Sequence, residues 1–461
     1  MNGKSDTLEV HDVAQPFSRP EIRAAIIDFP KGNVQVEGRA LEVVGWVVGS
    51  SSRVTAVELS EGPAWRVRQP TRSGREDVAR QYADSPQGPD VSFLLNSPPL
   101  AAGPHELSLT AVLEDGDTAP LGTIQLTAVL RARPAALILL YHRIVDLASE
   151  PWSLSVTPRH FQEQMSALAA IAQPIRLRRL VEALRKGGAL PERRVVVTFD
   201  DGYADNYHTA VPVLERHGVP ATVFLTTGFV GQPYEMWWDA LDRVLLEPGV
   251  LPPVLPLRVD GQVHEWDLGE DAAYPAERAA SFRSWRAGAP PPTRRHAVYR
   301  AAWDLLSTLD APARAAAVDQ LQTWSGIGGG ARRTHRSLTQ AELAELARSP
   351  AVEIGAHTIT HSALSELPRE AQRLEIEESK RQLEAQLATP VTGLAYPFGT
   401  RAHYTDETVE LVRRSGLQSA CTNVPAAVER DSDPYQLPRV IVPDVDGDRF
   451  AALLRKWLDD S

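Results

Sequence analysis

Cysteine, long apolar runs and an excess of positive charge are scarce or missing in this chain of 461 residues. The single cysteine, Cys421, excludes a framework of disulfides within the chain. No apolar run approaches the length of a membrane-spanning helix, and the first residues lack the apolar core of a secretory signal. The formal net charge of -11 argues against nucleic acid or an anionic membrane as the main partner. We therefore expect a cytoplasmic protein with no membrane span and no nucleic-acid partner.

The first third of the chain has the pattern of short antiparallel strands. Residues 1–20 are polar and predict a flexible tail. Residues 21–133 hold short alternating runs separated by turns, and Leu107, Leu109 and Leu113 follow a period of two before an acidic, glycine-containing turn. Six or seven such strands indicate an antiparallel β-sandwich with an accessory or binding role.

The pattern changes after a boundary at residues 131–134. Residues 134–461 alternate apolar strands with helical stretches, which is typical of a parallel α/β domain. The alternation is interrupted at residues 232–335, which we interpret as an insertion that covers one end of the domain. The insertion could shape a substrate cleft, although Trp237 and Trp238 fit a packing role equally well.

The stretch VVVTFDDGY at residues 195–203 predicts a buried strand that runs directly into two acids and a glycine. Asp200 and Asp201 would repel each other and lose solvation at the mouth of such a strand. A fold tolerates that pair mainly when a cation offsets the charge. Taken alone, the same letters also fit an Asp-Gly turn ahead of a helix.

Polar residues follow three other predicted strands at the point where each ends. His142 follows LILLY, His357 follows VEIGA, and the YPFG turn at residues 396–399 follows GLA. The carboxyl ends of parallel strands converge on one face of a barrel, where functional groups gather. We therefore expect these side chains to meet the acid pair.

The segment HTITH places His357 and His361 four residues apart. On a helical turn both imidazoles would face the same way, although this spacing alone also fits surface histidines. Combined with the acid pair, it predicts an Asp/His/His site with an open position. That ligand set suits a catalytic divalent cation, above all zinc.

Three segments resemble, in order, the motifs of polysaccharide deacetylases of the NodB-homology type (carbohydrate esterase family 4). They are TFDDGY at 198–203, HTITH at 357–361 and YPFG at 396–399, and the resemblance covers about residues 135–445. It implies a deformed (β/α) barrel and metal-dependent removal of an acetyl group from an N-acetylated sugar.

The resemblance also implies a role for each matching residue. Asp200, the first acid, would be the general base. The ligands of the metal would be Asp201, His357 and His361. The oxyanion and the substrate would be held along Tyr396, Pro397 and Phe398, with a backbone N–H near Phe398 facing the oxyanion.

The sequence departs from the family pattern at two places. Ala395 stands where the family usually has an arginine that orients the base. Arg439 in LPRVIV is a candidate replacement, although a structural salt bridge would also explain it. The leucine-histidine motif that the family usually has near its C-terminus is not evident there in this chain. LILLYH at 137–142 resembles that motif moved to the first strand, as in circularly permuted relatives that act on poly-N-acetylglucosamine. We therefore predict His142 as the general acid, with a buried structural histidine as the alternative.

These motifs favour a metal-dependent hydrolase that removes N-acetyl groups from a carbohydrate. The missing export signal favours a lipid-linked or nucleotide-linked sugar inside the cell over a finished wall polymer. One alternative is a hydrolase of the same fold that acts on cyclic amides or imides. Another is a glycan-binding protein without activity, against which the complete Asp/Asp/His/His set argues.

Overall fold

The computed structural model describes residues 7–15, 19–38, 40–129, 136–186 and 193–459. The chain divides into two compact units, residues 1–132 and residues 133–461. The predicted boundary at residues 131–134 lies outside the described residues.

The first unit consists of two antiparallel sheets that enclose an apolar core. The six-stranded sheet has the order β3 (Val34–Glu37), β1 (Thr7–Ala14), β9 (Thr118–Val129), β8 (Gly103–Leu113), β5 (Val54–Glu61) and β6 (Trp65–Pro70). The three-stranded sheet has the order β2 (Ile22–Phe29), β4 (Glu42–Gly49) and β7 (Ser92–Asn96), and a short helix, α1 (Glu76–Gln81), precedes β7. The core takes alternate side chains from both sheets, such as Leu107 and Leu109 of β8 and Val43 of β4. The predicted β-sandwich is confirmed.

The predicted flexible tail at residues 1–20 is wrong for residues 7–14. These residues form β1, which pairs with β3 on one side and β9 on the other. Leu8 and Val10 are buried, whereas Thr7 and Glu9 are not, so the strand has the period of two. The polar composition of the segment concealed this pattern, because only the inward-facing positions need to be apolar.

The second unit is built on a parallel barrel. Its eight-stranded sheet has the order β22 (Ser419–Cys421), β21 (Gly393–Ala395), β20 (Val352–Ala356), β15 (Ala221–Leu225), β14 (Arg194–Phe199), β10 (Leu137–Tyr141) and β23 (Val440–Ile441), with β13 (Gln173–Pro174) pairing β14 off this path. Cys421 of β22 forms a parallel bridge with Leu437, on the chain that leads into β23. This bridge closes the ring, so the predicted deformed (β/α) barrel is confirmed.

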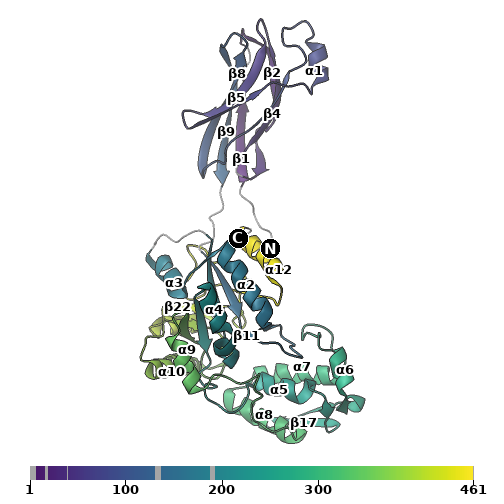
Figure 1. Ribbon diagram of the computed structural model, residues 1–461, viewed down its shortest axis with the longest axis vertical. Coiled ribbons are helices and arrows are strands. Elements are labelled where there is room, and N and C mark those ends of the chain that lie inside the picture. The colour runs from purple at the N-terminus through teal and green to yellow at the C-terminus, as the bar shows by residue number, and fades with distance from the viewer. Residues whose placement is uncertain (1–6, 16–18, 39, 130–135, 187–192, 460–461) are drawn as a thin grey trace. The chain divides into compact units, whose positions relative to one another are not determined.

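Helices cover the outside of the barrel and bury its outward-facing apolar residues. Figure 1 shows several of them around the sheet; their bounds are α2 (Pro158–Ile171), α3 (Leu177–Lys186), α4 (Val211–His217), α9 (Gln340–Arg348), α10 (Arg369–Leu387), α11 (Asp406–Arg414) and α12 (Gly447–Asp459). A π-helical turn, Asn206–Ala210, leads into α4, and a short parallel pair joins β11 (Arg143–Ile144) to β12 (Ser155–Val156). Threonine side chains cap α2, α9 and α11 at Thr157, Thr339 and Thr405. Among the described residues, no helix is both long enough and apolar enough to cross a bilayer.

The chain between β15 and α9 forms a subdomain with its own apolar core. We call residues 232–335 the 232–335 segment. Its helices are α5 (Trp237–Leu246), α6 (Ala276–Ser281), α7 (Arg294–Ser307) and α8 (Ala311–Ser325). Its strands pair as β16 (Gly249–Val250) with β19 (Ala273–Tyr274) and β17 (Val254–Val259) with β18 (Gln262–Asp267). Figure 1 shows α5, α7 and α8 together at one end of the second unit.

Candidate metal centre and active site

The polar residues predicted at strand ends all follow the carboxyl ends of parallel strands. His142 follows β10, Asp200 follows β14, His357 follows β20 and Tyr396 follows β21. Tyr141 and Phe199, the last residues of β10 and β14, pair with each other, and Ala356 at the end of β20 pairs with Leu394, one residue before the end of β21. The predicted convergence of these strand ends is therefore confirmed.

Asp201, His357 and His361 form a buried triad at this end of the barrel. One ligand atom from each residue lies within 4.8 Å of the other two. The Asp201 carboxylate oxygen Oδ1 is 3.5 Å from Nε2 of His357 and 3.4 Å from Nε2 of His361. Asp201 Oδ1 has no hydrogen-bond partner among the described residues, although it is fully buried. Such an orphaned oxygen between two imidazole nitrogens is what a divalent cation would satisfy.

The predicted helical turn over His357 and His361 is wrong. Residues 357–363 form an irregular loop, in which Thr358 and His361 have positive φ angles of 64° and 54°. The loop doubles back through these left-handed residues, and this turn brings the two imidazoles together. The side chain of Glu375 on α10 accepts hydrogen bonds from the backbone N–H groups of Ile359 and Thr360. Helix periodicity could not anticipate this arrangement.

His357 is oriented by a hydrogen bond to the backbone. Its Nδ1 lies 2.8 Å from the carbonyl oxygen of Ala395, and a carbonyl only accepts, so Nδ1 carries the proton. The ring is thereby turned so that Nε2 faces Asp201, which is the orientation that a metal ligand requires. Burial lowers the pKa of His361 to about 3, which keeps its imidazole neutral and able to bind a cation. The chemistry of the triad therefore fits a divalent metal.

Asp200 is held by Arg439, which comes from the loop before β23. The guanidinium donates to both carboxylate oxygens, from Nη1 to Oδ1 at 2.8 Å and from Nη2 to Oδ2 at 2.7 Å. Burial alone would raise the pKa of Asp200, but the charges of Arg439 and His357 outweigh it and hold the pKa below its ordinary value. Asp200 is therefore ionised at neutral pH.

The remaining donors of Arg439 are also used. Nε donates to the carbonyl of Thr422, Nη1 also to Thr198 Oγ1, and Nη2 also to Asn423 Oδ1. Together with the two bonds to Asp200, these contacts occupy all five N–H groups of a guanidinium. Asn423 was not identified from the sequence. Its amide Nδ2 donates to the carbonyl of Phe398, so it links Arg439 to the YPFG turn.

His142 is buried beside the acid pair. It is 8% exposed, and Asp201 and Asp200 are the carboxylates whose charges act on it. Burial nevertheless dominates and lowers the pKa of His142. Its Nδ1 has no hydrogen-bond partner among the described residues. The backbone carbonyl of His142 accepts from the amide of Asn206, which fixes the position of the residue.

The YPFG turn has side chains in two places, some in the apolar core and one beside His361. The side chain of Tyr396 does not join the site, because its ring stacks on Tyr404 at 4.5 Å and its hydroxyl donates to the carbonyl of Tyr435. Its predicted part in substrate binding is therefore wrong for the side chain, since the residue after β21 points into the apolar core. Pro397 is buried, and Phe398 is half-buried with its ring 4.8 Å from that of His361.

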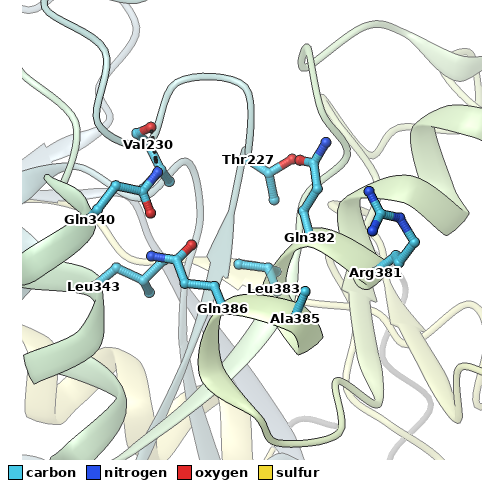
Figure 2. Close-up of a pocket in the computed structure, with 9 residues that line it drawn as sticks. All are labelled: Thr227, Val230, Gln340, Leu343, Arg381, Gln382, Leu383, Ala385 and Gln386. Atoms are coloured by element: carbon cyan, nitrogen blue, oxygen red, sulfur yellow. Dashed lines mark hydrogen bonds between the residues drawn. The ribbon is translucent and has the colours of Figure 1, made fainter.

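A pocket on the second unit lies away from these residues. The pocket has a volume of about 470 Å³ and lies between the loop after β15, α9 and α10 (Figure 2). The amides of Gln340, Gln382 and Gln386 line it, and none of the predicted site residues does. The pocket lies next to the loop of residues 357–363, because the N–H of Thr227, which lines the pocket, donates to the carbonyl of Thr358.

Comparisons with known proteins show similarity to one family within this barrel. The sequence model of the polysaccharide deacetylase family matches residues 187–250 and 290–420. The Bacillus subtilis protein YxkH, whose name provisionally describes it as a polysaccharide deacetylase, is 23% identical over 325 residues, which are 70% of this chain and 77% of that protein. A poly-β-1,6-N-acetyl-D-glucosamine N-deacetylase of Escherichia coli is 37% identical over 82 residues, which are 18% of this chain but only 12% of the E. coli protein. The solved structure of the Streptococcus pyogenes deacetylase PplD with acetate has a TM-score of 0.43 and 16% identity, covering 70% of this chain and 97% of that one.

The residues that the polysaccharide deacetylase model matches all lie in the second unit of this chain. The family resemblance predicted from TFDDGY, HTITH and YPFG is confirmed. Members of this family hydrolyse a carbon–nitrogen bond that is not a peptide bond, so the predicted enzyme class is confirmed as well.

Proposed function

We propose that this protein, through its polysaccharide deacetylase domain, removes N-acetyl groups from a glycan that contains N-acetylglucosamine, in a metal-dependent hydrolysis. The observation that carries the proposal is the buried triad of Asp201, His357 and His361 beside the ionised Asp200. The name of the E. coli relative, which specifies poly-β-1,6-N-acetyl-D-glucosamine, supports this choice of sugar.

Asp201, His357 and His361 would hold the metal. Two imidazoles and one carboxylate form a three-ligand set that leaves a position open, and zinc is the cation that we expect there. When bound, such a cation supplies Lewis acidity, which acidifies water and polarises an amide carbonyl. Its affinity would fall at low pH, because protons compete for the imidazole nitrogens.

Asp200 would act as the general base. Its carboxylate is ionised and held in one orientation by Arg439, so it is ready to take a proton from the attacking water. Arg439 would thus perform the orienting role that Ala395 leaves open. This role also explains why a fully buried arginine donates two of its five N–H groups to one carboxylate.

His142 would protonate the leaving amine. Because burial lowers its pKa, its protonated form is a stronger acid than a free imidazolium and gives up the proton more readily. The backbone near Phe398 would hold the oxyanion that forms as water attacks. Phe398 has a positive φ of 58°, and Asn423 anchors its carbonyl oxygen at 2.9 Å, so the peptide has a fixed orientation.

The proposal is tested by acetate release from a panel of N-acetylglucosamine polymers, oligosaccharides, lipid-linked sugars and sugar nucleotides. The purified full chain should release acetate from at least one of them, lose activity to a chelator and regain it with zinc. Asp200→Asn and His357→Ala should be inactive. Asp84→Asn and His208→Ala, which change exposed residues with surface partners, should retain activity. Full activity in Asp200→Asn and His357→Ala would exclude this site.

Assays on the same purified protein distinguish the proposal from the two alternatives, a hydrolase of cyclic amides or imides and a glycan-binding protein without activity. A cyclic amide or imide that is hydrolysed faster than any N-acetylated sugar would identify the first alternative. Glycan binding without turnover in the zinc-loaded protein would identify the second. The accessory role of the first unit and the cytoplasmic location stay predictions.

A further inference from the structure

The two histidines of the triad are oriented by different means. His357 has a hydrogen bond from Nδ1 to the carbonyl of Ala395. His361 has no partner for its Nδ1 among the residues that the structure describes, although the ring is buried. Histidines that bind metals usually donate their other N–H to a nearby acceptor, which fixes the ring. The orientation of His361 must therefore come from packing and from its backbone.

Two aromatic rings pack against the imidazole of His361. The Trp238 ring centroid lies 4.7 Å away, and that of Phe398 lies 4.8 Å away. Trp238 is itself fixed, because its indole N–H donates to the hydroxyl of Tyr203 at 2.7 Å. That hydroxyl donates in turn to Oδ2 of Asp239 at 2.6 Å. Tyr203 follows Asp201 by two residues, so one short chain of contacts leads from one triad residue to another through Trp238.

The backbone around His361 is held by Arg314 of α8. This arginine is 3% exposed and donates from Nη2 to the carbonyl of Thr360 at 2.9 Å and to Ser362 Oγ at 3.0 Å. Arg314 therefore binds the residues on both sides of His361. The backbone of His361 itself has a positive φ angle, in the left-handed region. A non-glycine residue keeps such a conformation only when its surroundings enforce it.

Trp238 and Arg314 both belong to the 232–335 segment. We infer that this segment completes the metal centre, with Trp238 and Arg314 as positioning residues that hold His361 for the cation. The inference rests on the proposed metal-dependent function. It assigns the segment a task beyond covering the barrel, because the segment sets the affinity and the ligand geometry of the metal.

The test measures metal binding rather than activity. Zinc affinity of the full chain is determined by competition with a chromophoric chelator for the wild type, Trp238→Phe and Arg314→Met. The expected result is a loss of about tenfold or more in affinity for each variant. The visible spectrum of the cobalt-loaded protein, which reports ligand geometry, should also change in both variants.

The segment offers matched controls for both substitutions. Arg295 is a buried arginine of α7 that donates to the carbonyls of Asp271, Glu247, Gly249 and Ala272. Trp285 is a buried tryptophan whose indole donates to the carbonyl of Pro290. Arg295→Met and Trp285→Phe should bind zinc with the wild-type affinity. If Arg314→Met does not fold, Arg314→Lys replaces it and should also bind zinc more weakly.

Each remaining outcome decides a different point. A wild-type protein that binds zinc, together with variants that bind it equally well and with an unchanged cobalt spectrum, would overturn the inference alone. Equal weakening in the control variants would also overturn it, because the effect would then come from the folding of the segment. A wild-type protein that binds no divalent metal would overturn the proposed function and the inference with it.

Discussion

Arg439 donates hydrogen bonds to both carboxylate oxygens of Asp200 across 239 residues of chain. The two side chains are 0% and 1% exposed, so water contributes nothing to the solvation of either charge. A bidentate pair of this kind is strong and directional. Ala395 stands where the family usually has an arginine, and Arg439 is the arginine that contacts Asp200 in this chain.

Arg439→Met should therefore be strongly destabilising, because it leaves Asp200 buried and without its counter-charge. We expect a loss of about 3–5 kcal/mol in the free energy of unfolding, measured by urea denaturation. Acetate release should fall with it. Arg439→Lys should recover part of the stability but not the bidentate geometry. Arg413→Met, which breaks the exposed pair with Asp433, should cost at most about 1 kcal/mol. Equal losses in the two methionine variants would contradict this account.

His142→Gln should lower kcat by about 100-fold or more, because the leaving amine would lose its proton donor. Zinc affinity should stay unchanged, since His142 is not a member of the triad. Steady-state acetate release and chelator competition measure the two quantities. His160→Gln, a change in a half-buried histidine paired with Asp444, serves as the control. A kcat near that of the wild type would assign His142 a structural role.

Stability should fall as the pH rises from about 4 to about 8, in part because of Asp242 on α5. Burial raises the pKa of this carboxyl from 3.8 to about 8, so the folded state keeps a proton that the unfolded state has lost. A group with a raised pKa in the folded state contributes its full stability below pH 3.8 and loses it as the pH rises through its folded value. Asp242→Asn cannot ionise, so its melting temperature should decline less between pH 5 and about pH 8. Asp319→Asn, at an exposed position of α8, should follow the wild type, and an unchanged decline in Asp242→Asn would exclude the role of Asp242.

Cys421 should resist thiol reagents in the folded protein. Its side chain is fully buried in β22, and burial raises the pKa of the thiol to about 12, so almost no thiolate is present at neutral pH. Ellman's reagent should detect no thiol in the native protein and one thiol per chain in guanidinium chloride. Rapid reaction of the native protein would mean that β22 opens readily.

Local patterns in the sequence were enough to predict a parallel α/β domain and its strand ends, whereas the barrel was predicted from the family resemblance. Val195, Val196 and Val197 are almost fully buried in β14, as the apolar run predicted, and Asp200 and Asp201 follow the strand directly. Period and composition act over a few residues, so they locate such elements well. They could not predict the loop over His357 and His361, because its left-handed residues depend on contacts from distant parts of the chain.

The supporting residues of the site were harder to find for the same reason. Asn423, Trp238 and Arg314 contact the site only through tertiary packing, and no motif in the sequence marks them. Arg439 was identified as a candidate only because the position of Ala395 required a partner for Asp200. Tyr396 shows the opposite case, in which a residue inside a motif turns its side chain into the core.

The closure of the barrel between Cys421 and Leu437 has a consequence for the order of synthesis. Asp200 leaves the ribosome 239 residues before Arg439, which follows the closing bridge by two positions. Throughout that interval the acid pair exists without its counter-charge, and the open sheet lacks its last strand. The pair of Asp200 and Arg439 therefore forms only as the end of the domain is made, so a nascent or prematurely terminated chain holds the TFDDGY motif without the arginine that contacts Asp200.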